Sequence, residues 1–225
     1  MGMCALPHSS RPTVTRNEAV HAATGILRVA GARRFGYVFP GSAWRGLLST
    51  PTLTVRLARV GDLDALRALM DAAIAELQKP FLDAGQIAAS RTFMGLDTQL
   101  IDDGTYFVVE AGGELAGCGG WSRRATLYGG DQTPGRSAEL LDPARDAART
   151  RAMYTHPRHV RKGVGRLILS RCETAARAAG FARMELMATL SGEPLYLACG
   201  YRPVERLTDD RGGVPVPLVR MIKAL

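Results

Sequence analysis

Hydrophobic and polar residues alternate in regular patterns from Thr52 onward. Val55 and Leu57 alternate with polar neighbours, which predicts a first strand. From 63 to 77, hydrophobic side chains recur at spacings of three and four, which is the period of an amphipathic helix. Asp62 stands directly before this stretch and is the expected N-cap. The domain is thus expected to begin as a strand followed by a helix.

The next part of the chain combines a second helical stretch, at about 84–94, with a hairpin. Residues 105–111 and 115–123 are strand-like and flank a glycine-rich turn at 112–114, which predicts antiparallel second and third strands. Residues 125–148 are rich in turn formers and acidic on balance. Loops of this length in a compact domain are usually functional, so we expect this one to border a functional site.

The pattern after this loop is strand, helix, strand. Residues 149–155 predict a fourth strand, and hydrophobic residues then recur at helical spacing from 164 to 179. Gly180 ends the helix, and residues 183–189 predict a fifth strand. Two strands joined in this way are expected to be parallel, with a right-handed crossover. A short helix near 192–198 and strands near 202–207 and 216–222 complete the pattern.

Residues 1–51 lack a sustained period and contain four prolines, so they are expected to form a poorly ordered leader before a single domain at 52–225. Six arginines and one glutamate fall within residues 1–55, which carry about +5 of the formal charge of +8. Arginine-rich, acid-poor leaders include transit peptides. Only three lysines accompany the arginines, which is typical of a GC-rich bacterial genome, so an over-long start site is the alternative.

Composition excludes several classes of protein. Hydrophobic residues make up 46% and charged residues 22%, which is typical of globular domains rather than disordered chains. No apolar run approaches the roughly 20 residues that a membrane-spanning helix needs. Cys4, Cys118, Cys172 and Cys199 are scattered, with no CxxC pair and no histidine at a ligand spacing. We therefore expect a cytoplasmic protein without a metal site, a disulfide framework or a membrane partner.

The stretch 156–169 (HPRHVRKGVGRLIL) lies where the fourth strand turns into its helix. Glycines at 163 and 165 let the backbone approach a bulky anion, and the free N–H groups of a helix start favour phosphate. Arg161, Lys162 and Arg166 add full positive charges. The alternative is a tight turn that binds nothing, because glycines before a helix often serve only that purpose.

Other familiar motifs are absent. A dinucleotide fingerprint needs a third glycine where this chain has Ile168, and a P-loop needs Gly-Lys followed by Ser or Thr, which occurs nowhere. No GxSxG elbow is present either, so a hydrolase is not expected. His156 and His159 lie beside the glycine turn, where they are explained as loop residues rather than metal ligands.

The sequence resembles the GNAT acetyltransferase superfamily, whose core is a strand, the loop (Q/R)xxGxG/A, a helix, a second strand and a later tyrosine. Residues 160–165 (VRKGVG) match the loop, except that Val160 stands where Gln or Arg is commonest. Residues 195–201 (LYLACGY) are similar to the LYxxxGF segment. The likeness covers about 53–225 and implies an α/β fold with a mixed α+β sheet of six to seven strands. Its N-terminal strands are antiparallel, a parallel strand–helix–strand unit follows, and helices flank the sheet.

The resemblance implies that acetyl-CoA is the co-substrate and that main-chain N–H groups of the loop hold its pyrophosphate. It also implies that the fourth and fifth strands splay apart, so that the pantetheine arm pairs with exposed backbone of the fourth. A backbone N–H near Tyr154 would then polarise the thioester carbonyl. The cofactor-binding residues implied in this way are Met153, Tyr154, Thr155, Arg161, Lys162, Gly163, Val164, Gly165, Arg166 and Thr189.

The resemblance places Tyr196 where many family members keep a general acid. A phenol near the leaving sulfur can protonate the thiolate, an effect typically worth about 10² to 10⁴ in rate. The alternative is an aromatic residue that only packs on the preceding strand. The general base stays open between Glu110, Tyr154 and a water relay, and a solvated strand residue is the favoured explanation of Glu110.

The leading hypothesis is an enzyme, an N-acetyltransferase that passes the acetyl group of acetyl-CoA to a small amine or a protein amino group. The alternative from another class is an acyl-CoA-binding sensor or interaction module without turnover. Nucleic-acid binding through the basic leader is the weakest hypothesis, since no aromatic residues interleave the basic turn. The oligomeric state stays open, with a homodimer as one option.

Overall fold

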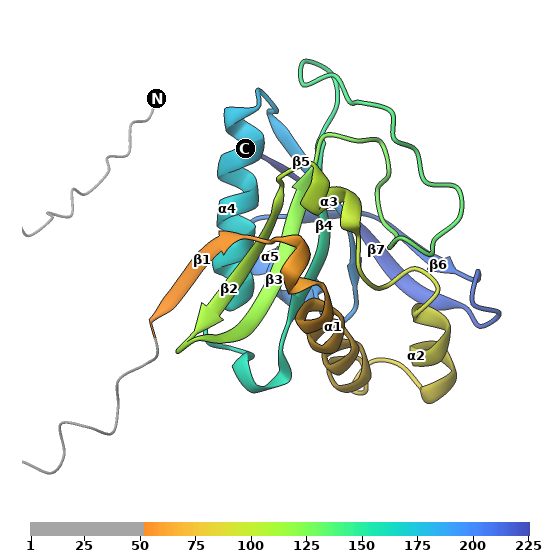
Figure 1. Ribbon diagram of the computed structural model, residues 1–225. Coiled ribbons are helices and arrows are strands. Elements are labelled where there is room, and N and C mark those ends of the chain that lie inside the picture. Colours follow the sequence, from red (N-terminus) through yellow and green to blue (C-terminus); the bar gives the residue numbers. More distant parts are fainter. Residues whose placement is uncertain (1–51) are drawn as a thin grey trace, which may run out of the picture. The chain divides into compact units, whose positions relative to one another are not determined.

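The computed structural model describes residues 52–225 (Figure 1), and the predicted leader at 1–51 lies outside the described residues. Within 52–225 a seven-stranded sheet has the order β1-β2-β3-β4-β5-β7-β6. The strands are β1 (Leu53–Leu57), β2 (Tyr106–Ala111), β3 (Glu114–Ser122), β4 (Ala148–Thr155), β5 (Arg183–Thr189), β6 (Arg202–Asp209) and β7 (Val216–Ala224). The helices are α1 (Leu63–Leu77), α2 (Ala84–Ser90), α3 (Thr98–Asp102), α4 (Val164–Ala178) and α5 (Glu193–Ala198), with 3-10 turns at Val60–Asp62 and Pro157–His159.

The sheet is mixed. From β1 to β4 each strand is antiparallel to the next, β4 and β5 are parallel and joined through α4, and β7 lies antiparallel between β5 and β6. The predicted mixed α/β fold with its parallel strand–helix–strand unit is therefore confirmed, and the bounds predicted for β5 match the structure.

Helices cover both faces of the sheet (Figure 1). One hydrophobic core gathers α4 and α5 through residues such as Ile168, Cys172 and Tyr196. A second core gathers α1 against the opposite face, where Leu66 and Ile74 are buried. The α4 helix thus lies on one side of the sheet and α1 on the other, and no helix within residues 52–225 is both long and apolar enough to cross a membrane.

The helix ends differ from the sequence-based expectations in physically simple ways. Asp62 precedes α1 as expected, but its side chain makes no hydrogen bond to the helix. The 3-10 turn holds Asp62 in a helical conformation, so its carboxylate turns back and accepts from Arg59 N–H (2.7 Å) and from the Arg56 guanidinium (2.7 Å). The carboxylate therefore ties the end of β1 to the start of α1.

The second helical stretch ends at Ser90, earlier than the expected 94. Ser90 Oγ donates to the carbonyl of Ile87, and Thr92 Oγ1 donates to the carbonyl of Ala89, both at 2.8 Å. Such short-range bonds compete with helix propagation. The sequence pattern also missed α3, which has only five residues and is too short to show a helical period.

Strands β4 and β5 separate soon after they start. They pair only at Ala148 with Met184 and at Arg149 with Glu185. Along its other edge β4 carries a bulge, because its register with β3 shifts by one residue near Ala152, whose φ is 48°. A bulge bends its strand and adds twist. The carboxyl end of β4 is consequently unpaired on the side that faces β5.

Gly119 makes room for this bulge. A Cβ added there would lie 2.7 Å from Met153 Cγ and 2.8 Å from Ile168 Cγ2, closer than van der Waals contact allows. A glycine on β3 therefore lets the bulged segment of β4 and helix α4 pack closely together.

Candidate functional site

A cavity of about 740 Å³ opens where β4 and β5 part. Its walls come from both faces of the sheet, since α4 and α5 line one end and α1, the 93–95 segment and the 127–129 segment line the other. The charged side chains that line it are Arg151, Arg161 and Arg166, and none of the lining residues within 52–225 is an aspartate or a glutamate. The cavity is therefore positively charged and has apolar walls.

The structure brings most of the predicted site residues to this one cavity. They come from the end of β4, the turn before α4, the end of β5 and α5. Those that line the cavity are Met153, Tyr154, Thr155, Arg161, Gly163, Val164, Gly165, Arg166, Thr189 and Tyr196. Lys162, in the same turn, and Glu110, on β2, are not among the lining residues.

The turn before α4 presents a row of backbone donors. The N–H groups from Arg161 to Arg166 donate to no acceptor outside α4 within residues 52–225, and no side chain caps the helix. Arg161 and Gly163 both have positive φ, at 62° and 85°. This conformation costs a non-glycine residue roughly 1–2 kcal/mol, so Arg161 is held there against its preference. Free N–H groups at a helix start form an anion-binding site.

The two glycines of the turn serve different purposes. A Cβ added at Gly163 would meet nothing within 4 Å, so Gly163 is needed for its backbone conformation and leaves open space toward the cavity. A Cβ added at Gly165 would lie 2.7 Å from Leu195 Cδ2. Gly165 therefore lets α5 pack against the first turn of α4, which brings Tyr196 beside the donor row.

Tyr196 lies almost buried, with 8% of its surface exposed. Its ring packs edge-on against Tyr201 at 5.8 Å between centroids. Its hydroxyl makes no hydrogen bond with another group in residues 52–225, and burial raises its pKa well above the usual value, with nearby cysteines adding to the effect. The phenol thus keeps its proton at neutral pH and is able to donate it.

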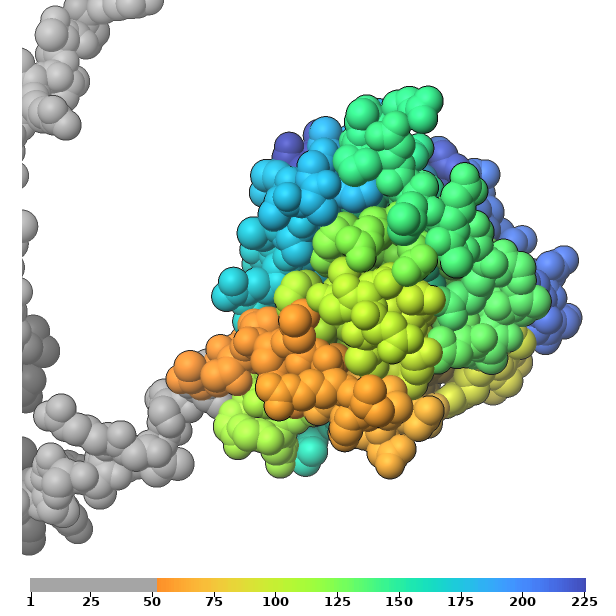
Figure 2. Space-filling view, turned by 45° about the horizontal axis from the view of Figure 1, so that its top comes forward, coloured from red at the N-terminus to blue at the C-terminus, as the bar shows by residue number. Residues whose placement is uncertain are grey.

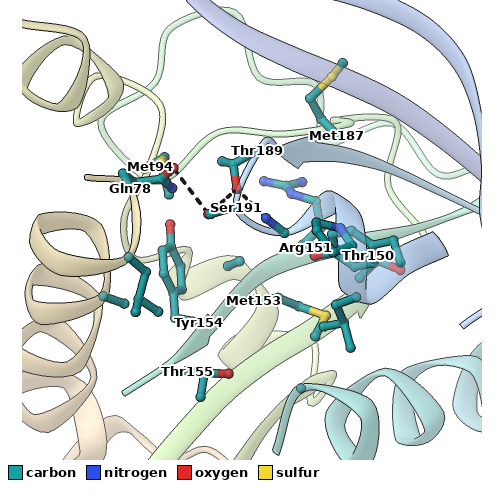
Figure 3. A pocket seen from close by; sticks show the side chains of 18 of the residues that line it. Gln78, Met94, Thr150, Arg151, Met153, Tyr154, Thr155, Met187, Thr189 and Ser191 are labelled. Atoms are coloured by element: carbon teal, nitrogen blue, oxygen red, sulfur yellow. Dashed lines mark hydrogen bonds between the residues drawn. The ribbon is translucent and has the colours of Figure 1, made fainter. Parts of the chain in front are cut away.

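Unlike that of Tyr196, the hydroxyl of Tyr154 has a hydrogen-bond partner among the described residues. Its hydroxyl accepts a hydrogen bond from the Gly95 N–H at 2.8 Å, and burial raises its pKa. Figure 3 shows this hydroxyl on the Gln78 and Met94 side of the cavity. A phenol with a raised pKa stays protonated at neutral pH, which argues against Tyr154 as the base but leaves its backbone in the cavity wall.

Glu110 is not part of this cavity. It pairs with Arg56, whose Nη2 lies 2.8 Å from its Oε1, and it sits opposite Thr54 in the β1–β2 register. The ion pair with Arg56 therefore holds its carboxylate beside the outer strand β1. We do not retain Glu110 as a candidate base.

His159 lines the cavity beside the donor row and is mostly buried. Its Nδ1 is buried without a hydrogen-bond partner in the described chain, and its Nε2 lies 3.9 Å from Glu114. Burial and the neighbouring Lys162 lower its pKa, so the ring is neutral at neutral pH. Residues 52–225 contain no cluster of three or more His, Cys, Asp or Glu side chains suited to a metal ion.

A buried ion pair that the sequence did not reveal fixes the wall opposite α4. Arg151 on β4 pairs with Asp97 at 2.7 Å, and each side chain is 3% exposed or less. Arg151 also donates to the carbonyls of Thr126 (2.8 Å) and Gly129 (2.6 Å). These bonds hold the long segment between β3 and β4 against the cavity. Figure 2 shows this segment in green.

The 125–148 loop reaches this cavity, because its residues 127–129 line it. Across the cavity, Ser191 Oγ donates to Gln78 Oε1 (3.2 Å) and lies 3.1 Å from Thr189 Oγ1 (Figure 3). Gln78 is 3% exposed. These three side chains form a polar chain across the opening between β5 and α1.

Comparisons with known proteins agree with this arrangement. The family described as "Acetyltransferase (GNAT) domain" matches residues 102–203. A GCN5-related N-acetyltransferase structure from Rhodopseudomonas palustris is similar with a TM-score of 0.57 and 20% identity, covering 80% of this chain and 98% of that chain. The PaiA N-acetyltransferase of Thermoplasma acidophilum, in complex with coenzyme A, gives 0.54 and 13%, covering 77% and 99%.

The yncA putative acetyltransferase of Salmonella typhimurium, with its cofactor acetyl-CoA, gives a TM-score of 0.51 and 22% identity, covering 77% of this chain and 94% of that chain. A comparison with curated proteins gives no significant match. At these identities the structural likeness establishes the fold alone.

Proposed function

We propose that the chain, whose residues 102–203 match the GNAT acetyltransferase domain, is a member of the GNAT superfamily and an N-acetyltransferase that passes the acetyl group of acetyl-CoA directly to an amine. The acceptor amine belongs to a small molecule or to a protein. Two of the similar structures were determined with coenzyme A or acetyl-CoA, which supports the choice of co-substrate.

One observation carries the proposal. The N–H groups from Arg161 to Arg166 are aimed at no acceptor outside their own helix in the described chain, and they lie at the mouth of a cavity that runs between separated strands. A diphosphate needs several donors and positive charge at close range. The side chains of Arg161 and Arg166 line the same cavity and supply that charge.

The remaining residues suggest how the chain would orient a thioester. Beyond the short pairing with β5, the backbone from Met153 to Thr155 has an unpaired edge that faces the cavity. A pantetheine arm carries amides that can hydrogen-bond to such an edge. The bound co-substrate would supply an activated acetyl group, and a backbone N–H near Tyr154 would donate to its carbonyl oxygen as negative charge develops.

Tyr196 is the proposed general acid. Its Oη holds a proton at neutral pH, has no other hydrogen bond in the described chain, and lines the cavity beside the α4 turn. Protonation of the leaving sulfur by this group would accompany cleavage of the carbon–sulfur bond.

A water relay is the proposed route by which the acceptor loses its proton. No carboxylate lines the cavity within the described chain, and Tyr154 is a poor base. The polar chain of Gln78, Ser191 and Thr189 offers hydroxyl and amide oxygens that can order water molecules.

The test combines titration calorimetry with acetyl-CoA and a free-thiol assay with a panel of amines. We expect binding together with amine-dependent thiol release. Binding without release over the whole panel would favour the sensor alternative, and absence of binding would overturn the proposal. The cytoplasmic location, the bacterial origin, a homodimer and the lack of a nucleic-acid partner remain predictions.

A further inference from the structure

The cavity continues past the proposed thioester position to an end built from large apolar side chains. This acceptor end is lined by Leu77, Phe81, Phe93, Tyr128, Met187 and Leu218. Resting on the function proposed above, we propose that this end selects an amine with an aromatic or aliphatic body and a single amino group, bound as the neutral base. Polyamines and other polycations are excluded.

An aromatic wall shapes the acceptor end. Phe93 and Tyr128 meet edge to face, with ring centroids 5.9 Å apart and an interplanar angle of 84°. Phe93 and Leu218 belong to one hydrophobic cluster, with Tyr128 and Met187 packed against it. Apolar and aromatic walls contribute favourable binding free energy only when they remove apolar ligand surface from water. A hydrated polycation offers little such surface.

The aromatic wall is fixed from behind. The Arg211 guanidinium carbon lies 5.0 Å from the Tyr128 ring centroid and 5.7 Å from that of Phe93. The Tyr128 hydroxyl donates to Asp209 Oδ2 at 3.0 Å, and Asp209 also pairs with Arg211. Both rings are thus held in position by their neighbours in the protein, which favours a preformed binding wall over a surface that adapts to any ligand.

The charges around the acceptor end disfavour ammonium ions. Asp209, which binds Tyr128, and Asp97, which binds Arg151, are both buried and already paired with arginines. Arg151 itself lines the cavity. An ammonium group here would lose water without gaining a carboxylate, which is unfavourable, and every additional charge on the ligand repeats the cost. A neutral amine avoids it.

The first experiment compares three acceptors on the full chain. Phenethylamine carries one amine on an aromatic body, spermidine is a flexible polycation, and a short peptide with a free amino terminus represents a protein substrate. We expect kcat/KM for phenethylamine, from thiol release, to exceed that for spermidine by about tenfold or more. Equal or higher values for spermidine or for the peptide would overturn the proposal.

Direct binding separates this proposal from the one on which it rests. Calorimetric titration of phenethylamine and of spermidine reports on the acceptor end without any acetyl transfer. Tighter binding of phenethylamine in a protein that releases no thiol would support the selectivity and refute the catalytic function. Thiol release with a preference for spermidine would support the catalytic function and refute the selectivity.

A matched pair of variants tests the charge argument. Phe81 is 45% exposed at the rim of the cavity, so substitution there spares the core. Phe81→Glu introduces a carboxylate, and Phe81→Gln introduces a neutral side chain with the same shape as glutamate. We expect the spermidine-to-phenethylamine ratio of kcat/KM to be about fivefold higher in Phe81→Glu, as for a partly exposed ion pair. Equal ratios in the two variants would contradict the charge argument.

A second pair tests the aromatic wall. Tyr128→Ala removes the ring, whereas Tyr128→Phe keeps the ring and removes only the bond to Asp209. We expect KM for phenethylamine to rise about tenfold in Tyr128→Ala and much less in Tyr128→Phe, with the acetyl-CoA Kd unchanged in both. A KM for phenethylamine that is the same in both variants would show that the wall does not contact the acceptor.

Discussion

The two ends of the cavity are built by different means. The end proposed for the pyrophosphate is made of backbone, in which six consecutive residues from Arg161 to Arg166 present their N–H groups. The acceptor end is made of side chains from distant segments, such as Phe81, Phe93, Tyr128 and Leu218. A backbone site needs only the right local conformation, whereas a side-chain site needs the whole fold to bring its parts together.

The largest effect is expected from the buried ion pair between Asp97 and Arg151, which holds the wall of the acceptor end. Asp97→Asn leaves the Arg151 guanidinium without a charged partner, and removing one partner of a buried pair costs about 3–5 kcal/mol. We expect a loss of this order in the free energy of unfolding, measured by urea denaturation. At temperatures where the variant is folded, KM for the amine should rise more than the acetyl-CoA Kd.

Asp131→Asn is the matched control. Asp131 pairs with Arg136 as Asp97 does, but its side chain is 41% exposed. Exposed pairs contribute about 1 kcal/mol or less, so this variant should unfold close to the wild type. Equal losses in the two variants would mean that burial of Asp97 does not stabilise the wall.

Tyr196→Phe addresses the proposed chemistry between the two ends. The change removes the proposed proton donor and keeps the ring that packs against Tyr201. We expect kcat to fall about 10²-fold or more with little change in acetyl-CoA affinity. Thiol-release kinetics together with calorimetry would measure both. Unchanged turnover would remove Tyr196 from the mechanism.

Gly163→Ala tests the backbone end. At its φ of 85° a side chain costs roughly 1–2 kcal/mol, and the added methyl group enters open space beside the donor row. We expect acetyl-CoA affinity to fall about fivefold or more by calorimetry, and further in Gly163→Val, whose branched side chain obstructs the anion.

The hairpin turn supplies the control. Gly113 has φ of 86°, and a Cβ added there likewise meets nothing within 4 Å. Gly113→Ala therefore introduces similar backbone strain between β2 and β3, away from the cavity. It should reduce stability comparably and leave acetyl-CoA affinity as in the wild type. A similar loss of affinity in both variants would attribute the effect to strain alone.

The smallest expected effect concerns pH. Burial raises the pKa of Tyr196, so its acid form persists above the usual tyrosine value of about 10. If it is the general acid, kcat should not decline between about pH 8 and pH 10 through loss of this proton. The dependence of kcat on pH, measured at saturating amine, tests this prediction. A decline of kcat in the wild type that is absent from Tyr196→Phe would contradict it.

The sequence points to the backbone end because the signals for it are local. Gly163, Gly165 and the basic residues occupy one short stretch, and the strand and helix around them have clear hydrophobic periods. The mixed sheet with its parallel strand–helix–strand unit followed from the same periods. The short helix α3 could not be predicted from these periods, because five residues are too few to show a helical period.

The acceptor end could not be predicted in the same way. Arg151 and Asp97 are 54 positions apart, and Tyr128 and Asp209 are 81 apart. No motif or spacing links such residues, so only the packed fold shows that they meet. Glu110 illustrates the same limit, because the partner that draws it away from the cavity, Arg56, lies on another strand.

A crystal structure of the full chain with acetyl-CoA tests the central claim most directly. We expect oxygens of the diphosphate at about 2.7–3.2 Å from backbone nitrogens between Arg161 and Arg166, with the acyl end directed between β4 and β5. A complex in which these N–H groups bind other parts of the protein, or in which the cofactor lies on another face, would contradict the account.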